Sequence, residues 1–235
     1  MSTSPLMNVA LLRGYAPYTL AGLAAFRAVI ESDGAVSAKL KAMFAAVAAV
    51  DRRHLDLARR ELARGGELGL TPKEATAGLI VLTSLRGEAA ALHFATIISE
   101  TFADSSGPVP QELPVAAEGE AEANFKAYWA GSVPTPLAQL MRLVPKAADA
   151  YYLMRRGSID ANPLSPKHGE LLLLTILAAG YSPMAATHVR GARNAGAVDE
   201  EIAEAVLCAV PAAGIAAWMA VGGMLAPPEE GGIPR

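Results

Sequence analysis

An approximate internal repeat is the feature of this sequence that most restricts how the chain can fold. A shift of 128 residues aligns Pro17 with Pro145, Arg27 with Arg155, Ser37 with Ser165 and Lys39 with Lys167. A shift of 127 residues aligns Gly69 with Gly196, Glu74 with Glu201 and Gly87 with Gly214. Because the offset is nearly constant, and because helix-ending glycines and helix-opening carboxylates fall in matching places, we interpret the chain as an ancestral duplication.

The two halves are separated by a segment whose composition is typical of a linker. Residues 103–119 read ADSSGPVPQELPVAAEG, with three prolines, two glycines and a pair of serines. Such a stretch cannot form a regular helix or strand. We therefore expect a degenerate N-terminal repeat at residues 1–103, a linker at 104–119 and a C-terminal repeat at 120–235.

Each half is expected to contain four main helices, and the fold class is expected to be all-α. No stretch alternates apolar and polar residues over enough positions to predict a strand. Helix-capping and helix-ending residues set the expected boundaries. In the first half, the expected helices are residues 17–30, a second helix after Ser37, residues 51–64 ending before Gly65-Gly66, and a fourth helix opened by Thr71 and Glu74. In the second half, the counterparts are residues 145–156, a second helix after Ser165, residues 183–194 ending before Gly196, and a fourth helix that begins at Asp199.

The composition excludes several classes of protein. Hydrophobic residues make up 52% of the chain and charged residues 18%, which is unlike a disordered protein. The formal charge of −3 argues against a nucleic-acid-binding protein, which normally carries a basic face. The lone cysteine, Cys208, excludes an internal disulfide framework and a zinc cluster. A chain so poor in charge fits helices that are buried on several sides, so we expect an oligomer.

One segment is long enough to span a bilayer. Ala205–Leu225 contains 21 residues and no charged side chain. It also contains Pro211 and Gly214 and has no basic flank, so a buried helical hairpin is favoured over a membrane span. No secretory signal is recognisable in residues 1–13. The expected location is the cytoplasm.

The segment Leu164–Trp218 resembles the carboxymuconolactone decarboxylase and alkylhydroperoxidase D superfamily. The resemblance rests on Glu170-Leu171 opening an apolar helix, on His188 followed by Ala192, on Gly196, and on the Asp-Glu-Glu-Ile-x-Glu stretch from Asp199 to Glu204. It implies an all-helical fold that assembles as trimers or hexamers, with two units per chain in tandem versions. For this chain it implies a homotrimer, with the first half a degraded copy of the second.

The resemblance also implies a site that brings a glutamate and a histidine together. In the peroxidase branch, two cysteines stand seven and four residues before the histidine and carry out the redox chemistry. Tyr181 and Met184 occupy those positions here, and neither can form a thiolate. What is left is acid–base chemistry by Glu170 and His188, with Tyr181 on the same helical face if the helix begins early enough. The plainer alternative is a core histidine and a helix-entry glutamate.

Further positions are candidates for substrate binding. In the first half, Glu61 falls on the position of His188 and His54 on that of Tyr181, but a surrounding group of arginines favours a solvated face. Some of these arginines could instead hold a carboxylate. The remaining candidates are Glu88 and His93, which interrupt an apolar helix, and Arg190, for which a subunit contact is favoured over a carboxylate clamp.

These observations predict a cofactor-free acid–base enzyme of decarboxylase, lyase or isomerase type. Its substrate would be a small carbonyl, lactone or carboxylate compound, and no metal, nucleic-acid or membrane partner is expected. One alternative is a non-catalytic helical scaffold or small-ligand binder. A second is an atypical peroxidase using Cys208, although that residue reads more simply as a small buried hydrophobe.

Overall fold

The computed structural model describes residues 4–103, 107, 112–129 and 131–225, and within these residues the fold is all-α without a strand. The helices are η1 (Pro5–Asn8), α1 (Ala10–Tyr15), α2 (Pro17–Glu31), α3 (Ala38–Asp51), α4 (Leu55–Glu67), α5 (Pro72–Arg86), α6 (Glu88–Thr101), α7 (Glu120–Tyr128), α8 (Thr135–Leu143), α9 (Pro145–Ile159), α10 (Pro166–Ala179), α11 (Ala185–Asn194), α12 (Asp199–Leu207), α13 (Val210–Ala213), α14 (Ala216–Met219) and η2 (Gly222–Leu225).

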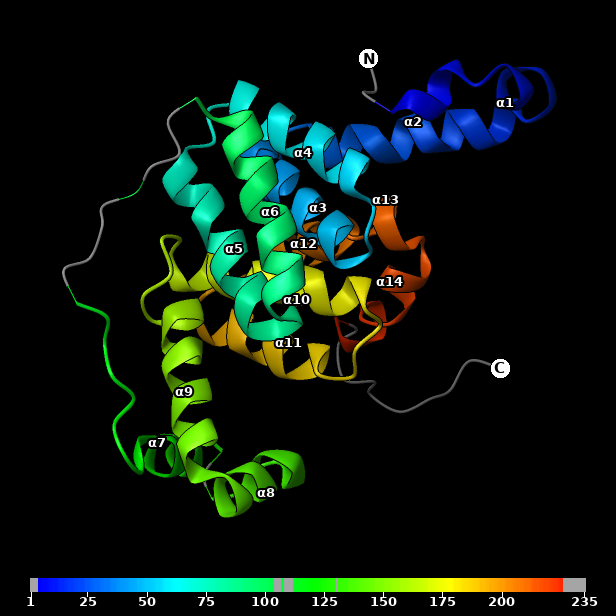
Figure 1. The fold of residues 1–235 in the computed structure, drawn as a ribbon. Coiled ribbons are helices and arrows are strands. Elements are labelled where there is room, and N and C mark those ends of the chain that lie inside the picture. The colour runs from blue at the N-terminus through cyan, green and yellow to red at the C-terminus, as the bar shows by residue number, and fades with distance from the viewer. Residues whose placement is uncertain (1–3, 104–106, 108–111, 130, 226–235) are drawn as a thin grey trace, which may run out of the picture.

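Two apolar helices, α3 and α10, form the centre of the body and pack against each other (Figure 1). Residues 42–50 of α3 and 171–179 of α10 are buried without a break. A helix that is apolar on all sides must be surrounded by protein. Helices of both halves therefore pack around this pair, and the large hydrophobic core contains residues from each half.

Two arms extend from this body. Figure 1 shows α1 and the adjoining part of α2 projecting at one end, and α7, α8 and the start of α9 projecting at another. The second arm has a small core of its own, in which Phe125 of α7 is buried with Ala148 and Tyr152 of α9. The first arm has no comparable core within the described residues, and most of its apolar side chains are exposed.

Details of the backbone and of its ion pairs recur at the offset of the sequence repeat. Gly87 and Gly214 have φ of 81° and 73°, and the non-glycine residues Arg53 and Tyr181 have φ of 62° and 53°. The Lys39–Glu74 ion pair of 2.7 Å recurs as Lys167–Glu201 at 2.6 Å. The duplication is still an inference from sequence, and these recurrences support it.

The expected starts of the third helices and the expected end of the first of them were wrong, whereas the helix of the second half ends at Asn194 as expected. Asp51 ends α3, and α4 begins only at Leu55, because the left-handed conformation of Arg53 turns the chain between them. In the second half the same conformation at Tyr181 delays α11 to Ala185. The pair Gly65-Gly66 lies inside α4 rather than after it. A Cβ on Gly65 would lie 3.1 Å from a methyl group of Leu70 and 3.5 Å from the Ala42 Cβ, so this glycine permits close packing.

The uncharged segment Ala205–Leu225 is not a hairpin of two long helices. It comprises the end of α12 followed by the short helices α13, α14 and η2, with a break at Gly214. No helix in the described part of the chain is both long enough and apolar enough to cross a bilayer. Of the expected linker, residues 104–106 and 108–111 lie outside the described residues, and the helices on either side of it end at Thr101 and begin at Glu120.

Candidate functional site

The candidate site is built around a contact between α10 and α11. Glu170 lies in the first turns of α10 and His188 in the first turn of α11, and their Oε2 and Nδ1 atoms are 2.7 Å apart. The side chains are 9% and 17% exposed, respectively. The sequence expectation that this pair meets therefore matches the geometry, although its chemical role is a separate question.

A glycine on α11 makes room for the carboxylate. A Cβ on Gly191 would lie 2.7 Å from Oε2 of Glu170 and 2.9 Å from Oε1, closer than any real contact allows. The carboxylate thus packs directly against the backbone of the helix that carries His188. This close approach holds the acid beside the imidazole, three residues away along α11.

With Nδ1 occupied by the carboxylate, Nε2 is the ring nitrogen of His188 that is left to contact a bound molecule. No described residue forms a hydrogen bond with Nε2. In a neutral imidazole one nitrogen carries the proton and the other accepts one. If Nδ1–H donates to Glu170, Nε2 is the atom that can take a proton from a bound molecule.

His188 lines a small pocket that crosses from one half of the chain to the other. The pocket has a volume of about 50 Å³. Its wall consists of Ser84, Leu85, Tyr151, Arg155, Ser158, Ile159, Leu173 and His188, so α5 of the first half faces α9, α10 and α11 of the second. The hydroxyl groups of Ser84 and Ser158 are 2.7 Å apart and share a hydrogen bond.

Arg155 brings a positive charge to this pocket. Its guanidinium lies 4.6 Å from the ring centroid of Tyr128 and 6.0 Å from that of Trp129, both near the end of α7. Cation–π contacts of this kind hold the side chain without neutralising it. The same guanidinium lies 5.9 Å from the ring centroid of Phe125, and Arg155 forms no ion pair within the described part of the chain.

Tyr181 does not join the pair. Because α11 begins at Ala185, Tyr181 lies in the preceding turn and cannot share a helical face with His188, so the conditional expectation fails. Its ring is 42% exposed, its hydroxyl donates to the carbonyl oxygen of Ala213, and the guanidinium of Arg52 lies 5.3 Å from its ring centroid. Tyr151 is the tyrosine that lines the pocket.

The first-half candidates do not share one site. Glu61 is buried, accepts from Arg27 at 2.6 Å and from Arg64 at 2.9 Å, and the expected solvated face is therefore wrong for this residue. Its charge is compensated by Arg27 of α2 and Arg64 of α4. His54 precedes α4, is exposed, and does not line the pocket that contains Glu61.

The remaining candidates are exposed. His93 lines a pocket of about 430 Å³ that also includes Asp51, Arg53 and Arg86. In it Arg86 pairs with Asp51 and also donates to the carbonyl oxygen of Ile176 at 3.2 Å. Glu88, at the start of α6, does not line that pocket, and Arg190, on α11, does not line the His188 pocket. The structure thus separates these three residues from the Glu170–His188 pair.

Cys208 is poorly suited to thiol chemistry. The residue is completely buried, and its Sγ–H donates to the carbonyl oxygen of Glu204 at 3.2 Å. Burial raises the pKa of the thiol to about 12. Since the thiolate is the nucleophile, this environment disfavours a peroxidase mechanism at Cys208.

Sequence reasoning missed most of the pocket wall. Arg155 carried a signal, because it matches Arg27 in the repeat, but that match was interpreted only as a sign of duplication. Gly191 lies between His188 and Ala192, two residues on which the family resemblance rests, but it is not among the predicted site residues. Ser84 carried no signal, because it comes from the other half of the chain.

One family model matches the part of the chain that contains the Glu170–His188 pair. Residues 145–225 match the model of the carboxymuconolactone decarboxylase family. The matched segment runs from the start of α9 to the end of η2 and contains both Glu170 and His188. Among curated proteins no match to the chain was found.

Proposed function

From the membership of residues 145–225 in the carboxymuconolactone decarboxylase family, we propose that the chain is a cofactor-free acid–base catalyst of the cytoplasm. Its substrate would be a small carbonyl, lactone or carboxylate compound. The observation that carries this proposal is the 2.7 Å contact between Nδ1 of His188 and Oε2 of Glu170. This contact leaves Nε2 as a proton acceptor at the pocket wall.

The carboxylate would orient the imidazole of His188 so that Nε2 faces the pocket as the base. Glu170 accepts from Nδ1–H and stabilises the imidazolium that forms when Nε2 takes a proton. In an isomerisation, the C–H bond beside a carbonyl breaks, its electron pair passes into an enolate, and the imidazolium, whose proton exchanges with solvent, protonates another carbon. In a decarboxylation, Nε2 first takes a proton from solvent, the C–C bond breaks, carbon dioxide leaves, and the imidazolium gives that proton to the resulting enolate carbon.

Arg155 would bind the carboxylate of the substrate. The first half offers an internal comparison, because Arg27 precedes Arg155 by 128 residues and Glu61 precedes His188 by 127. There, Arg27 and the carboxylate of Glu61 are 2.6 Å apart. An arginine at this place in the repeat can therefore reach a carboxylate located beside the position of His188. The serine hydroxyls and Tyr151 would supply further hydrogen bonds to the substrate.

Substrate entry requires the pocket to widen. A volume of about 50 Å³ is small beside the few hundred cubic ångströms of ordinary ligand pockets. One wall is formed by α9, which belongs to the arm with α7 and α8 and packs on the body mainly through α5. A shift of α9 that carries Tyr151 and Arg155 outward would open the pocket beside His188.

The small volume also favours a second candidate function. A non-catalytic scaffold or ligand-binding protein would need the fold but no room beside His188. Under that alternative the Glu170–His188 contact would be a buried structural pair, and its loss would lower stability without abolishing a reaction.

Exchange of substrate protons with solvent deuterium distinguishes an acid–base catalyst from a non-catalytic scaffold or ligand-binding protein. The probes are a panel of unsaturated lactone carboxylates and β-keto acids in deuterium oxide, followed by proton NMR. With the parent protein, we expect enzyme-dependent loss of a C–H signal or of the carboxyl group. In His188→Ala and Glu170→Gln, the rate of this loss should decrease by about 100-fold or more. The exposed Glu200→Gln serves as a control and should react as the parent does. Equal rates in all four proteins would exclude the pair from catalysis.

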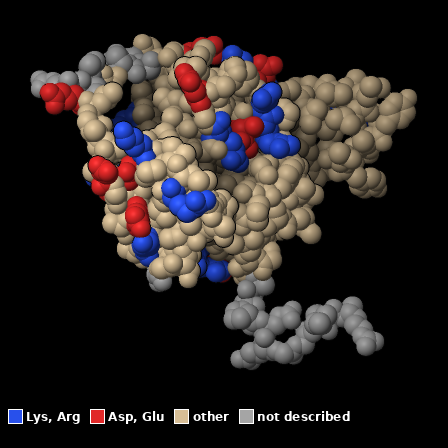
Figure 2. All heavy atoms as spheres, turned by 60° about the horizontal axis from the view of Figure 1, so that its bottom comes forward, with Lys and Arg blue, Asp and Glu red and all other residues tan. Residues whose placement is uncertain are grey.

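We also propose that copies of the chain associate, with three as the expected number. Support comes from the exposed apolar arm of α1 and α2, which contains only one charged residue, Arg13, between Pro5 and Phe26. Figure 2 shows this arm, at the right, almost without charged side chains. Exposed apolar surfaces of such extent are typical of association sites.

A further inference from the structure

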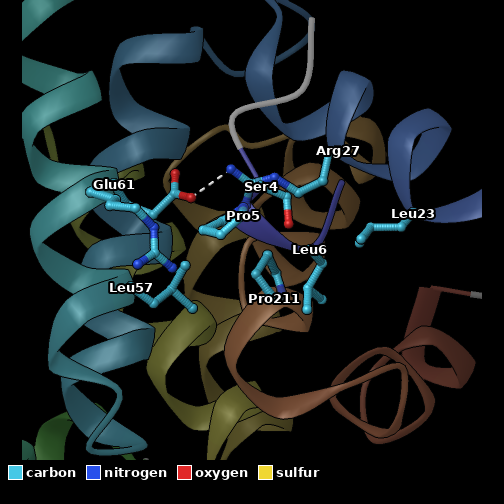
Figure 3. A pocket seen from close by; sticks show the side chains of 9 residues that line it. Ser4, Pro5, Leu6, Leu23, Arg27, Leu57, Glu61 and Pro211 are labelled. Carbon is cyan, nitrogen blue, oxygen red and sulfur yellow. Dashed lines mark hydrogen bonds and ion pairs between the residues drawn. The ribbon is translucent and has the colours of Figure 1, made fainter. Parts of the chain in front are cut away.

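A second pocket opens in the N-terminal half, where η1, α2, α4 and α13 meet (Figure 3). Its volume is about 320 Å³, within the range of small-molecule sites. Its lining residues are Ser4, Pro5, Leu6, Leu23, Arg27, Leu57, Arg60, Glu61 and Pro211. Of these lining residues the family match includes only Pro211, and none of them lines the His188 pocket.

This pocket occupies the place in the first half that the His188 pocket occupies in the second. At the repeat offsets, Leu23 corresponds to Tyr151, Arg27 to Arg155, Glu61 to His188 and Pro211 to Ser84. Each pocket therefore lies at the seam where the first and third helices of one half face a segment of the other half. The two pockets share their position but differ in chemistry.

The change from histidine to glutamate removes the proton acceptor. Oε1 of Glu61 accepts from Arg27 at 2.6 Å, and Oε2 accepts from Arg64 at 2.9 Å. The carboxylate is 2% exposed, and both of its oxygens are engaged by guanidinium groups. Because both oxygens already accept from guanidinium groups, the carboxylate presents no free oxygen to a bound molecule. The pocket is thus suited to binding rather than to proton transfer.

The charges around the pocket leave an excess of one positive charge. Arg27 pairs with both Glu31 and Glu61, and Arg64 shares Glu61. The additional charge is that of Arg60, which lines the pocket, is exposed, and forms no ion pair with a described residue.

Opposite these charges the wall is apolar. Figure 3 shows Leu6, Leu57 and Pro211 gathered on one side of the cavity, and the Arg27–Glu61 pair on the other. Leu23 of α2 adds to the apolar lining. A molecule that fits this lining must combine an apolar body with a single anionic group.

We propose that this pocket binds a small organic carboxylate with an apolar body. Its carboxylate would meet the guanidinium of Arg60, and its body would contact the leucines and Pro211. A planar guanidinium matches a carboxylate through two parallel hydrogen bonds. The site is separate from the proposed catalytic pocket, so either can exist without the other.

Titration calorimetry with benzoate tests the anion preference, with benzamide as the neutral analogue of the same shape. We expect benzoate to bind and benzamide to bind at least about tenfold more weakly. Arg60→Gln should weaken benzoate binding about tenfold and leave benzamide unchanged. Arg59→Gln is the matched control, because Arg59 is exposed on the same helix but pairs with Glu100 and lines a different pocket.

A substitution that fills the cavity tests where the molecule binds. Leu23→Trp places an aromatic group where the second half carries Tyr151, so the fold should accept it while the cavity shrinks and benzoate binding falls. His188→Ala and Arg155→Gln should both leave benzoate binding unchanged, which separates this site from the proposed catalytic one. The proposal is overturned if the parent does not bind benzoate, if Arg60→Gln binds it as well as the parent, or if only the Arg155 variant loses it.

Discussion

Individual glycines determine where two carboxylates of this protein can lie, the buried Glu170 and the partly buried Glu204. Glu170 packs against Gly191, and Glu204 packs against Gly34, where a Cβ would lie only 2.2 Å from a carboxylate oxygen. In both cases the missing side chain lets a carboxylate reach its partner, which is His188 for Glu170 and Lys41 for Glu204. The position of a charge is thus set by a residue that carries none.

Gly191→Ala should disturb the candidate site without unfolding the chain. The new Cβ would lie 2.7 Å from Oε2 of Glu170, so the carboxylate must move away from Nδ1 of His188. Alanine is favoured over glycine inside a helix by up to about 1 kcal/mol, so stability should be nearly unchanged. We expect the ring signals of His188 in NMR spectra to shift and any proton-transfer activity to fall.

Gly22→Ala is the control for this substitution. It makes the same change inside a helix where no atom lies within 4 Å of the new Cβ. Its His188 signals should match those of the parent. Unchanged ring signals in Gly191→Ala would show that the glycine does not position Glu170.

Cys208 should be unreactive in the folded protein. Burial raises the pKa of its thiol to about 12, so at pH 8 only about one molecule in 10,000 carries a thiolate. We expect no reaction with Ellman's reagent until the chain unfolds in denaturant, after which one thiol per chain reacts. Rapid labelling of the native protein would revive a redox role for Cys208, as would loss of a peroxidase activity in Cys208→Ser.

At the scale of the helices, an ion pair between a lysine of α3 and a glutamate of α12 links the two halves of the chain. Lys41 is 1% exposed, and its ammonium group lies 2.9 Å from the carboxylate of Glu204. Partial burial opposes ionisation of Glu204, but hydrogen bonds from the backbone N–H of Val36, from Lys41 and from the N–H of Ala35 outweigh it and lower the pKa. The carboxylate is therefore an integral part of the junction between the repeats.

Glu204→Gln should destabilise the protein by about 3 kcal/mol near neutral pH, because it leaves a buried ammonium group without its counter-charge. The folded-state pKa of Glu204 is lower than its unfolded value of about 4.3, so its stabilisation is present above that value and is lost as the pH falls through the folded-state pKa. The difference in the free energy of unfolding between parent and variant, measured by urea denaturation, should therefore shrink as the pH falls through the folded-state pKa.

The exposed pair Arg59–Glu100 provides a matched control. Glu100→Gln removes a surface carboxylate from a pair whose side chains are both more than two-fifths exposed, and should cost less than about 1 kcal/mol. If Glu204→Gln cost no more than this control, Lys41 and Glu204 would not secure the junction.

The elements themselves were largely predictable from sequence, because their signals are local. Pro17 and Pro145 begin α2 and α9, and Ser37 and Ser165 directly precede α3 and α10. The Thr71–Glu74 capping box forms as expected. The starts of α4 and α11 were missed because the chain turns at Arg53 and Tyr181, non-glycine residues in the left-handed region that give no sequence signal.

The candidate site was predictable only in part, and for a related reason. Glu170 and His188 lie 18 residues apart in one motif, so the resemblance to a family could pair them. Ser84 and Arg155 reach the same pocket from α5 and α9, and their meeting depends on how the two halves pack. Contacts between distant elements are not contained in the local pattern of either one.

At the scale of the whole molecule, the two arms differ in what covers them. On the second arm, α7 buries Phe125 against α9. No described element covers the outer side of α1 and the start of α2, where Leu11, Tyr15 and Tyr18 are 71%, 87% and 92% exposed. If a second copy of the chain covers this surface, charge placed on it should separate the copies.

Leu11→Glu combined with Tyr18→Glu should convert the proposed trimer to a monomer, because burying two carboxylates in an apolar contact is costly. Light scattering after size-exclusion chromatography measures the mass, and circular dichroism should show unchanged helix content, since both residues point to solvent within one chain. Leu92→Glu, on the exposed side of α6 away from the arm, should leave the mass of the parent unchanged. A parent that runs as a monomer would refute self-association, and a parent dimer disrupted by the same charges would keep the surface but correct the number of copies.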